Sequence, residues 1–399
     1  MKKIITRSIW ILSLVSLFTD VASEMLYPIM PVYLKSIGFS IVLIGVLEGF
    51  VEAVAGISKG YFGQLSDHLK KRVPFIRLGY GFSAFAKPLL AVFTFPLWIF
   101  MVRTIERLGK GIRTSARDAF LSDQTTSHYK GQVFGFHRAM DTLGASIGPI
   151  LALVFLLFYP GNYKWLFILS VIPGIIALSL TFILREKTNE AMVNSSTIHF
   201  FSFLSYWKRS GIQYKWIVLG LLLFALFNSS DAFILLSLKE VKGYTDSQMI
   251  GFYIFYNLVY ALLSYPIGRL ADKIGLHKML LGGIFLFSII YVCYGFASGV
   301  LFLLVLFFGY GLYASATEGI SKALITNLCK KEDTGTAVGF YNSFLSVFTL
   351  LASSIGGLIW FLTSAKIMFM VSGMGAFLAF LFLLFAFKKF RVEAKPATP

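Results

Sequence analysis

The chain has 399 residues, of which 57% are hydrophobic and only 14% are charged. Soluble globular proteins carry about 25% charged residues, so this composition excludes a soluble domain and predicts an integral membrane protein. The many apolar runs of about 20 residues fit helices that cross roughly 30 Å of hydrocarbon, whereas barrel strands would show alternating segments of about ten residues. We therefore expect an all-α bundle of transmembrane helices.

The formal net charge of +17 does not predict nucleic-acid binding, because the basic residues lie between apolar runs and not on one polar face. Cys293 and Cys329 are the two cysteines, and they lack the paired spacing of a zinc site or a disulfide framework. The chain also lacks a P-loop, which would indicate ATP hydrolysis. We expect neither an enzyme nor a metal or cofactor site, and we expect a monomer.

Twelve apolar runs predict twelve membrane spans. Six lie near residues 8–34, 41–62, 74–93, 96–117, 131–158 and 164–184. Six more lie near residues 216–238, 247–267, 279–297, 299–322, 335–361 and 365–387. The sequence thus predicts a first half at 1–184, a cytoplasmic linker at 185–214, and a second half with a short cytoplasmic tail at 215–399. The aromatic part of the linker suits either an interfacial helix or a simple connection.

Lysine and arginine are unequally distributed between the two sides of the predicted bundle. The tails and loops on the side of the N-terminus hold twenty of them, and those on the other side hold five. Loops rich in Lys and Arg stay on the cytoplasmic side of a membrane. We therefore expect a multi-pass protein of the plasma (inner) membrane with both termini in the cytoplasm.

A short polar hairpin occurs twice, 205 positions apart. Its corresponding residues are Gly63, Asp67 and Arg72 in the first copy and Gly268, Asp272 and Lys278 in the second. Each copy lies between two apolar runs, so each is a turn between helices. Duplication at half the chain length indicates two similar six-helix halves, as in secondary transporters whose substrate site lies between the repeats.

Ionisable residues inside the apolar runs are candidate functional groups, because a charge at the bilayer centre costs at least about 3 kcal/mol. The candidates for proton coupling are Asp20, Glu24, Glu48, Glu52 and Asp231. The candidates for substrate contact or counter-charge are Lys87, Arg103, Arg107, Asn257, Glu318 and Asn342. Burial and pairing move the pKa of a carboxyl group in opposite directions, which suits proton-coupled transport. A fixed ion-pair network that only locks helices together is the alternative.

Some charged residues have a simpler interpretation. Arg113 and Arg117 lie near the end of their run and fit the bias of basic residues toward the cytoplasm. Glu318 and Lys322 are four residues apart, a spacing at which they can neutralise each other. Asp141 lies four residues after a histidine, but two ligands are a weak indication of a metal site. Pairing of Asp141 with the cations of residues 96–117 is the preferred interpretation.

These features resemble the major facilitator superfamily over nearly the whole chain. The hairpins at 63–72 and 268–278 are similar to the family's signature between spans 2 and 3. Residues 107–111 are similar to its arginine motif, and residues 144–149 to the start of its glycine-proline motif of exporters. The resemblance implies two pseudo-symmetric six-helix halves. It also implies that Asp67 helps to close the cytoplasmic side by contacting basic residues and the start of the run at 335–361.

We predict a secondary transporter that alternates between inward-open and outward-open states within the lipid bilayer. The first hypothesis is proton-coupled export, by antiport, of a small amphipathic molecule. The second is a proton-linked uptake symporter for an anionic metabolite or metal chelate. The third is a non-transporting membrane protein, such as a sensor or a lipid scramblase.

Overall fold

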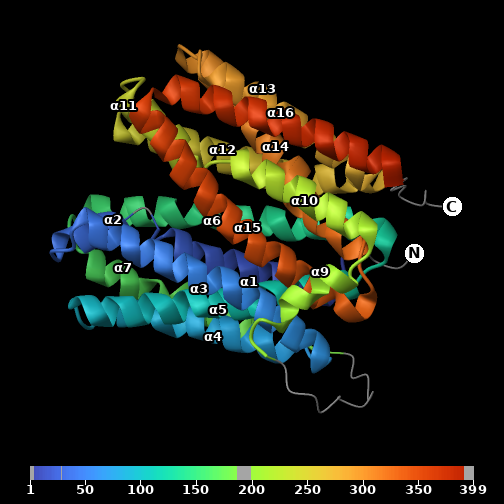
Figure 1. The fold of residues 1–399 in the computed structure, drawn as a ribbon. Coiled ribbons are helices and arrows are strands. Elements are labelled where there is room, and N and C mark those ends of the chain that lie inside the picture. Colours follow the sequence, from blue (N-terminus) through green and yellow to red (C-terminus); the bar gives the residue numbers. More distant parts are fainter. Residues whose placement is uncertain (1–3, 28, 187–198, 391–399) are drawn as a thin grey trace. The chain divides into compact units, whose positions relative to one another are not determined.

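The computed structural model describes residues 4–27, 29–186 and 199–390, which form α-helices and short 3₁₀ helices (Figure 1). Each of the twelve predicted runs coincides with one helix or with two consecutive helices. Eight segments of this part of the chain are long and apolar enough to cross a membrane. The other four runs lie between residues 7 and 123, where most of the candidate ionisable residues are found. The predicted tail beyond residue 390 and residues 187–198 of the linker lie outside the described residues.

The helices pack into two compact units. The first unit takes residues up to 124 together with 140–208 and 330–343. Its own helices are α1 (Arg7–Glu24), α2 (Met30–Ser36), α3 (Ile41–His68), α4 (Val73–Leu89), α5 (Pro96–Asp123), α7 (Tyr163–Leu169), α8 (Val171–Thr181), η2 (Ser202–Ser205), α9 (Tyr206–Arg209) and η3 (Lys331–Asp333). In this unit α5 packs on α3 and α4, and α8 packs on α1 and α4.

The second unit takes residues 125–139, 209–329 and those from 344 onward. Its own helices are η1 (Ser127–Tyr129), α10 (Ile212–Phe227), α11 (Asp231–Glu240), α12 (Asp246–Ile274), α13 (Leu276–Tyr294), α14 (Val300–Asn327) and α16 (Ala365–Phe390). Here α14 packs on α12 and α13, and α16 packs on α10 and α13. This is the packing pattern of the first unit, with α12, α13 and α14 in the places of α3, α4 and α5.

Two long helices contribute to both units. The first turns of α6 (Lys130–Phe158) belong to the second unit, and the first turns of α15 (Thr334–Leu362) belong to the first unit. The units therefore differ from the predicted halves at residues 125–139 and 330–343. These exchanged segments are the ones that contact the duplicated hairpins.

The first span of each repeat is broken, where the sequence predicted continuous runs at 8–34 and 216–238. Helix α1 ends at Glu24 before α2 begins, and α10 ends at Phe227 before α11 begins. At the second break the side chain of Ser230 accepts a hydrogen bond from the amide of Ala232. Short polar side chains compete with the helical backbone in this way, which explains the break. The run at 164–184 is also divided, at Ser170.

The described part of the linker packs on the first unit. Phe203 is buried and lies against Gly60 of α3, where a larger residue would collide with its ring. Trp207 stacks on Phe340 of α15 with the ring centroids 5.7 Å apart. Residues 199–209 thus form short helical turns held by aromatic contacts.

Candidate transport site

One face of helix α5 carries four closely spaced charged residues. Residues three and four apart lie on the same side of a helix. This spacing groups four residues of α5 on one face, and α3, which packs on α5, presents two acidic residues one turn apart. The α5 residues are Arg103, Glu106, Arg107 and Lys110, and the α3 residues are Glu48 and Glu52.

Arg103 forms the two shortest ion pairs in this group of residues. Its two terminal nitrogens lie 2.5 Å from Glu48 Oε1 and 2.6 Å from Glu106 Oε2. The Arg103 side chain is only 6% exposed, while its partners Glu48 and Glu106 are 37% and 13% exposed. An arginine that bridges two carboxylates in this way joins α3 and α5.

Arg107 is held much more loosely. Its nitrogens lie 3.8 Å from Glu48 Oε2 and 3.6 Å from Glu52 Oε2, beyond hydrogen-bonding distance. The two glutamates are 37% and 41% exposed. Lys110, one turn further on, is exposed and forms no ion pair with the residues that the structure describes. Arg107 and Lys110 are therefore the cations that an incoming anion can reach.

Acidic residues from α1 and α6 meet beside these cations. Asp20 and Glu24 lie one turn apart at the end of α1, and both are attracted electrostatically to Lys110. Asp20 and Asp141 interact electrostatically, and Ser16 Oγ donates a hydrogen bond to Asp141. Asp141 was expected to pair with a cation of α5, and it interacts electrostatically with Arg117 of that helix. The sequence did not indicate that Ser16 and Asp141 meet, because their helices are far apart in the chain.

Several cations of α4 and α5 are buried. Lys87 is 1% exposed, and its Nζ donates to the carbonyl of Ser83 in its own helix. Arg113 donates to Ser83 Oγ over 2.7 Å and lies over the ring of Tyr80. Arg117 pairs with the next residue along the chain. Both Arg113 and Arg117 are less than a tenth exposed, and each has a polar or charged partner in addition to its place near the end of the run.

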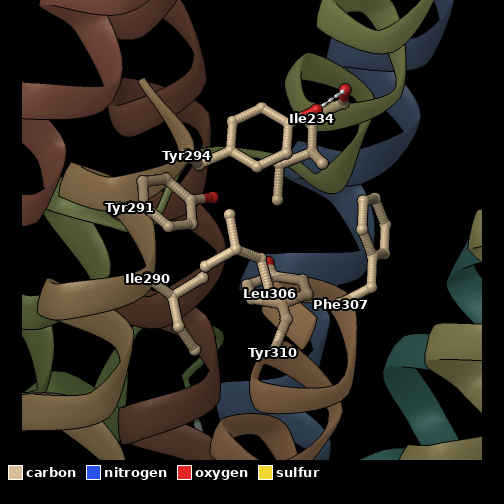
Figure 2. A pocket seen from close by; sticks show the side chains of 7 residues that line it. All are labelled: Ile234, Ile290, Tyr291, Tyr294, Leu306, Phe307 and Tyr310. Atoms are coloured by element: carbon tan, nitrogen blue, oxygen red, sulfur yellow. Dashed lines mark hydrogen bonds between the residues drawn. The ribbon is translucent and has the colours of Figure 1, made fainter. Parts of the chain in front are cut away.

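In the second unit tyrosines replace most of the charges. Asp231, at the start of α11, accepts a hydrogen bond of 2.6 Å from Tyr310. A cavity of about 10 Å³ lies beside it, lined by Ile234, Ile290, Tyr291, Tyr294, Leu306, Phe307 and Tyr310 (Figure 2). Such a volume holds about one water molecule and no organic substrate.

Glu318 of α14 has a partner that the sequence did not indicate. It forms an ion pair with Arg138 of α6, whose Nε also donates to the hydroxyl of Tyr260 over 2.6 Å. Spacing within one helix cannot reveal a pair formed between α6 and α14. The two amide candidates are buried, and Asn257 donates to the carbonyl of Tyr253, while Asn342 lies in α15.

The first hairpin binds the beginning of α15. Asp67 accepts hydrogen bonds from the amide of Gly335, over 2.9 Å, and from the hydroxyl of Thr336, over 2.6 Å. The amide of Thr336 and the guanidinium of Arg72 also donate to it. The carboxylate thus meets the positive end of a helix dipole and a cation together. This is the contact that the family resemblance implied for Asp67.

The second hairpin repeats the contact on α6 with fewer partners. Asp272 accepts hydrogen bonds of 2.8 Å from the amides of Gly131 and Gln132, in the first turn of α6. Lys278, the counterpart of Arg72, is exposed and pairs with no carboxylate among the described residues. The two hairpins therefore share the helix-end contact and differ in the cation.

Glycines allow these close contacts in both copies. A Cβ atom on Gly63 would collide with the backbone of Gly335, and one on Gly268 would collide with the backbone of Gly131. In both turns the residue three positions after the hairpin aspartate has a positive φ, which is 51° at Lys70 and 107° at Gly275. Positive φ is common for glycine and costly for lysine.

Two units with one packing pattern, charged groups inside the helical bundle and polar hairpins at its turns define a membrane transporter. The chain belongs to the Major Facilitator Superfamily, because that family's model matches residues 12–257 and 246–399. It is 30% identical over 391 residues to an uncharacterised MFS-type transporter of Methanocaldococcus jannaschii, covering 96% of this chain and 95% of that protein.

Two further similarities have a named activity. The chain is 26% identical to the staphyloferrin B transporter of Staphylococcus aureus, covering 95% of this chain and 94% of that one. Its fold resembles the crystal structure of a human organic anion transporter with a TM-score of 0.82 at 16% identity, covering 94% and 99% of the two chains. The predicted all-helical fold of the family is thereby confirmed. The chain is a multi-pass secondary transporter with a small-molecule substrate, and it is not an enzyme.

Proposed function

We propose that the protein carries a small organic anion across the membrane together with protons. The observation that supports this most is the loose position of Arg107, 3.6 and 3.8 Å from two half-exposed glutamates, next to an exposed Lys110 with no ion-pair partner among the described residues. A carboxylate or phosphate group of a substrate can displace Glu48 or Glu52 from Arg107 at little cost, because these contacts are long.

Protonation and anion binding assist each other at such a site. A proton on Glu24 or Glu52 removes a negative charge that acts on Lys110. The cation then attracts an anionic substrate more strongly, and by reciprocity the bound anion raises the affinity for the proton. Binding of both or of neither is the thermodynamic basis of symport. We therefore place uptake of an anion with protons ahead of the first hypothesis from the sequence.

Export by antiport is the second candidate. It rests on the similarity of residues 144–149 to a motif of exporters. In the structure Gly144 lies against the backbone at Leu17, and Gly148 lies against the backbone at Val21 and Met25. Close packing of α6 on α1 explains these glycines without reference to the direction of transport. The motif therefore favours export less than the charges favour symport.

The hairpins have a proposed role in the change of conformation. Asp67 and Asp272 are proposed to hold the first turns of α15 and α6 in one state and to release them in the other. The positive-inside distribution of basic residues supports a cytoplasmic location for both hairpins and both termini, in the plasma membrane. Asn257, Glu318 and Asn342 stay proposed substrate or counter-charge residues, while Arg103 is proposed as a purely positioning one.

Proteoliposomes containing the purified protein and an entrapped pH dye test the function. Succinate and citrate are added outside as probe anions, with and without an imposed inward proton gradient. We expect acidification of the lumen on addition of an anion, and faster anion entry when the gradient is present. Proton movement against the anion would establish antiport instead. Equilibration of labelled lipid between leaflets, without any gradient-dependent flux, would contradict transport.

A charge-neutral variant tests the substrate contact. In Lys110→Gln we expect the KM for the anion to rise about tenfold, equivalent to about 1.4 kcal/mol, because one cationic contact is lost. Lys71→Gln is the matched control, since Lys71 is an exposed lysine of the first hairpin. An unchanged KM in Lys110→Gln, or an equal rise in both variants, would contradict the proposed anion site.

A further inference from the structure

We infer that a groove between α13 and α16 binds one anionic phospholipid of the surrounding bilayer. An acyl chain lies in the groove, and the phosphate group contacts the ammonium of Lys366. The groove has a volume of about 470 Å³ and is formed within the second unit. None of the residues that form it belongs to the proposed coupling or substrate groups. The inference therefore goes beyond the proposed function and does not depend on it.

The groove follows the line along which α13 and α16 pack, side by side and antiparallel (Figure 1). A Cβ atom on Gly373 of α16 would lie 2.9 Å from the carbonyl oxygen of Ser288 on α13, so the two backbones approach closely there. About one turn further along both helices, the ring centroids of Phe285 and Phe377 lie 6.2 Å apart. Larger side chains outside this line of close approach form the walls of the groove.

The walls of the groove are apolar and point away from the rest of the unit. Phe285 and Ile289 of α13 and Met374 of α16 line the groove and are exposed. The hydroxyl of Ser288, which also lines it, is buried and donates to the carbonyl of Gly373 over 2.8 Å. Lipid tails are as apolar as these side chains. The groove thus suits a hydrocarbon chain and offers little to a polar solute.

A cation lies at one end of the groove. Lys366, the second residue of α16, is exposed, and its Nζ lies 4.1 Å from the centre of the Phe296 ring. Its side chain reaches Gly295, two positions beyond Cys293, which lines the groove. Among the described residues no hydrogen bond or ion pair engages its ammonium. An ammonium has three donors, which suit the oxygens of a phosphate group.

The distance from this cation to the far end of the groove matches one leaflet of a bilayer. Phe377 lines the groove eleven positions after Lys366, which is about three helical turns and places both residues on one face of α16. At 1.5 Å per residue this distance is about 17 Å. One leaflet contributes about 15 Å of hydrocarbon, half of the roughly 30 Å core. A phospholipid with its phosphate at Lys366 can therefore place its chain along the whole groove.

The charge bias of the chain does not account for Lys366. It is one of only five basic residues in the loops of the side that is predicted to face away from the cytoplasm. In that orientation the bound lipid belongs to the outer leaflet. Lys164 of α7 has the corresponding place in the first unit, since it is the second residue of the helix that begins the sixth span. It is also exposed, which makes it the matched control for Lys366.

Photochemical crosslinking of the reconstituted full-length protein tests the headgroup contact. The probe is a phosphatidylglycerol with a diazirine in one acyl chain, and peptide mass spectrometry locates the label. We expect saturable labelling of residues 285–293 or 374–378. Unlabelled phosphatidylglycerol should compete about fivefold better than phosphatidylcholine with the same chains, because one lysine near an anionic lipid contributes about 1 kcal/mol. Lys366→Gln should lose this preference, whereas Lys366→Arg and Lys164→Gln should keep it.

A second pair of variants tests the contact of the chain. Met374→Trp places a large ring in the groove and should abolish the saturable label for both headgroups. Met101→Trp is the control, because Met101 is an exposed methionine of α5, and it should leave the label unchanged. All of these changes are at exposed positions, and thermal unfolding checks that each variant is folded.

Four results would overturn the inference. They are labelling that unlabelled phosphatidylglycerol does not reduce, equal competition by the two headgroups in the wild type, an equal loss of preference in Lys366→Gln and Lys164→Gln, and an unchanged label in Met374→Trp. A second copy of the chain in the groove would appear as a dimer in native mass spectrometry that Met374→Trp dissociates, and it would also overturn the inference. Transport is not measured in these experiments, so failure of the proposed anion transport leaves their outcome unaffected.

Discussion

The two units of this transporter have the same packing pattern and very different interiors. In the first, α5 packs on α3 and α4 and carries ion pairs that involve Arg103 and Arg107. In the second, α14 packs on α12 and α13, but the interior is built from packed aromatic rings near Asp231, such as those of Tyr256 and Tyr310, whose centroids are 4.9 Å apart. Duplication has therefore preserved the scaffold, while the chemistry of the two copies has diverged.

This difference suggests that the two units have different roles in transport. Ion pairs respond strongly to protonation, whereas tyrosine clusters change little over the physiological pH range because the pKa of an ordinary tyrosine is about 10. We therefore expect proton coupling in the first unit, and we expect a structural or substrate-contacting role for Asp231.

The largest effect is expected from Arg103→Met, which leaves Glu48 and Glu106 without their shared cation. Breaking a buried ion pair by removing one partner costs about 3 kcal/mol or more. Thermal unfolding in detergent should show a clear loss of stability. Arg103→Lys keeps the charge but not the two-pronged geometry, so its loss should be smaller. Equal stability of Arg103→Met and the wild type would contradict a fixed network in the first unit.

The second largest effect on stability is expected at the glycine contacts of the hairpins. Gly335→Ala places a methyl group against the backbone oxygen of Gly63, and such overpacking costs about 1–3 kcal/mol. Gly282→Ala is the control, because no atom lies within 4 Å of the position of its Cβ, and alanine favours a helix by about 1 kcal/mol. Thermal unfolding should therefore move in opposite directions for the two variants.

The two hairpin aspartates should differ in strength. Asp67→Asn weakens bonds to a helix end and removes the partner of Arg72, whereas Asp272→Asn weakens bonds to a helix end alone. Hydrogen exchange should accelerate about tenfold in the first turn of α15 for Asp67→Asn, since bonds to charged groups contribute about 1.5–3 kcal/mol. For Asp272→Asn the acceleration in the first turn of α6 should be smaller. The opposite order would show that the ion pair with Arg72 does not strengthen the contact of the first hairpin with α15.

The smallest effect concerns the turn after Asp67. Lys70 has a φ of 51°, where a non-glycine residue carries about 1–2 kcal/mol of strain. Lys70→Gly should therefore stabilise the protein slightly, by about 0.5 kcal/mol after the flexibility of glycine in the unfolded chain is counted. Lys71→Gly, at a residue without positive φ, should not stabilise it. A loss of stability in Lys70→Gly would mean that the lysine side chain itself forms a stabilising contact.

The sequence predicted the scaffold well, because long apolar runs and a duplicated hairpin are local signals. It also placed Asp67 correctly against the start of α15, through resemblance to the family. It did not predict that Ser16 and Asp141 meet, or that Arg138 pairs with Glu318, because those contacts join helices far apart in the chain. The breaks near Glu24 and Asn228 were missed for another reason, since polar residues inside an apolar run indicate function and a break equally well.

The most direct test of the account compares gradient-driven flux in Glu52→Gln and Asp231→Asn, reconstituted side by side in proteoliposomes. We expect Glu52→Gln to lose gradient-driven accumulation of the anion and to retain counterflow exchange. We expect Asp231→Asn to accumulate the anion with the proton gradient, at a rate reduced less than about tenfold. Intact gradient-driven accumulation in Glu52→Gln, together with its loss in Asp231→Asn, would place the coupling in the second unit and contradict the central claim.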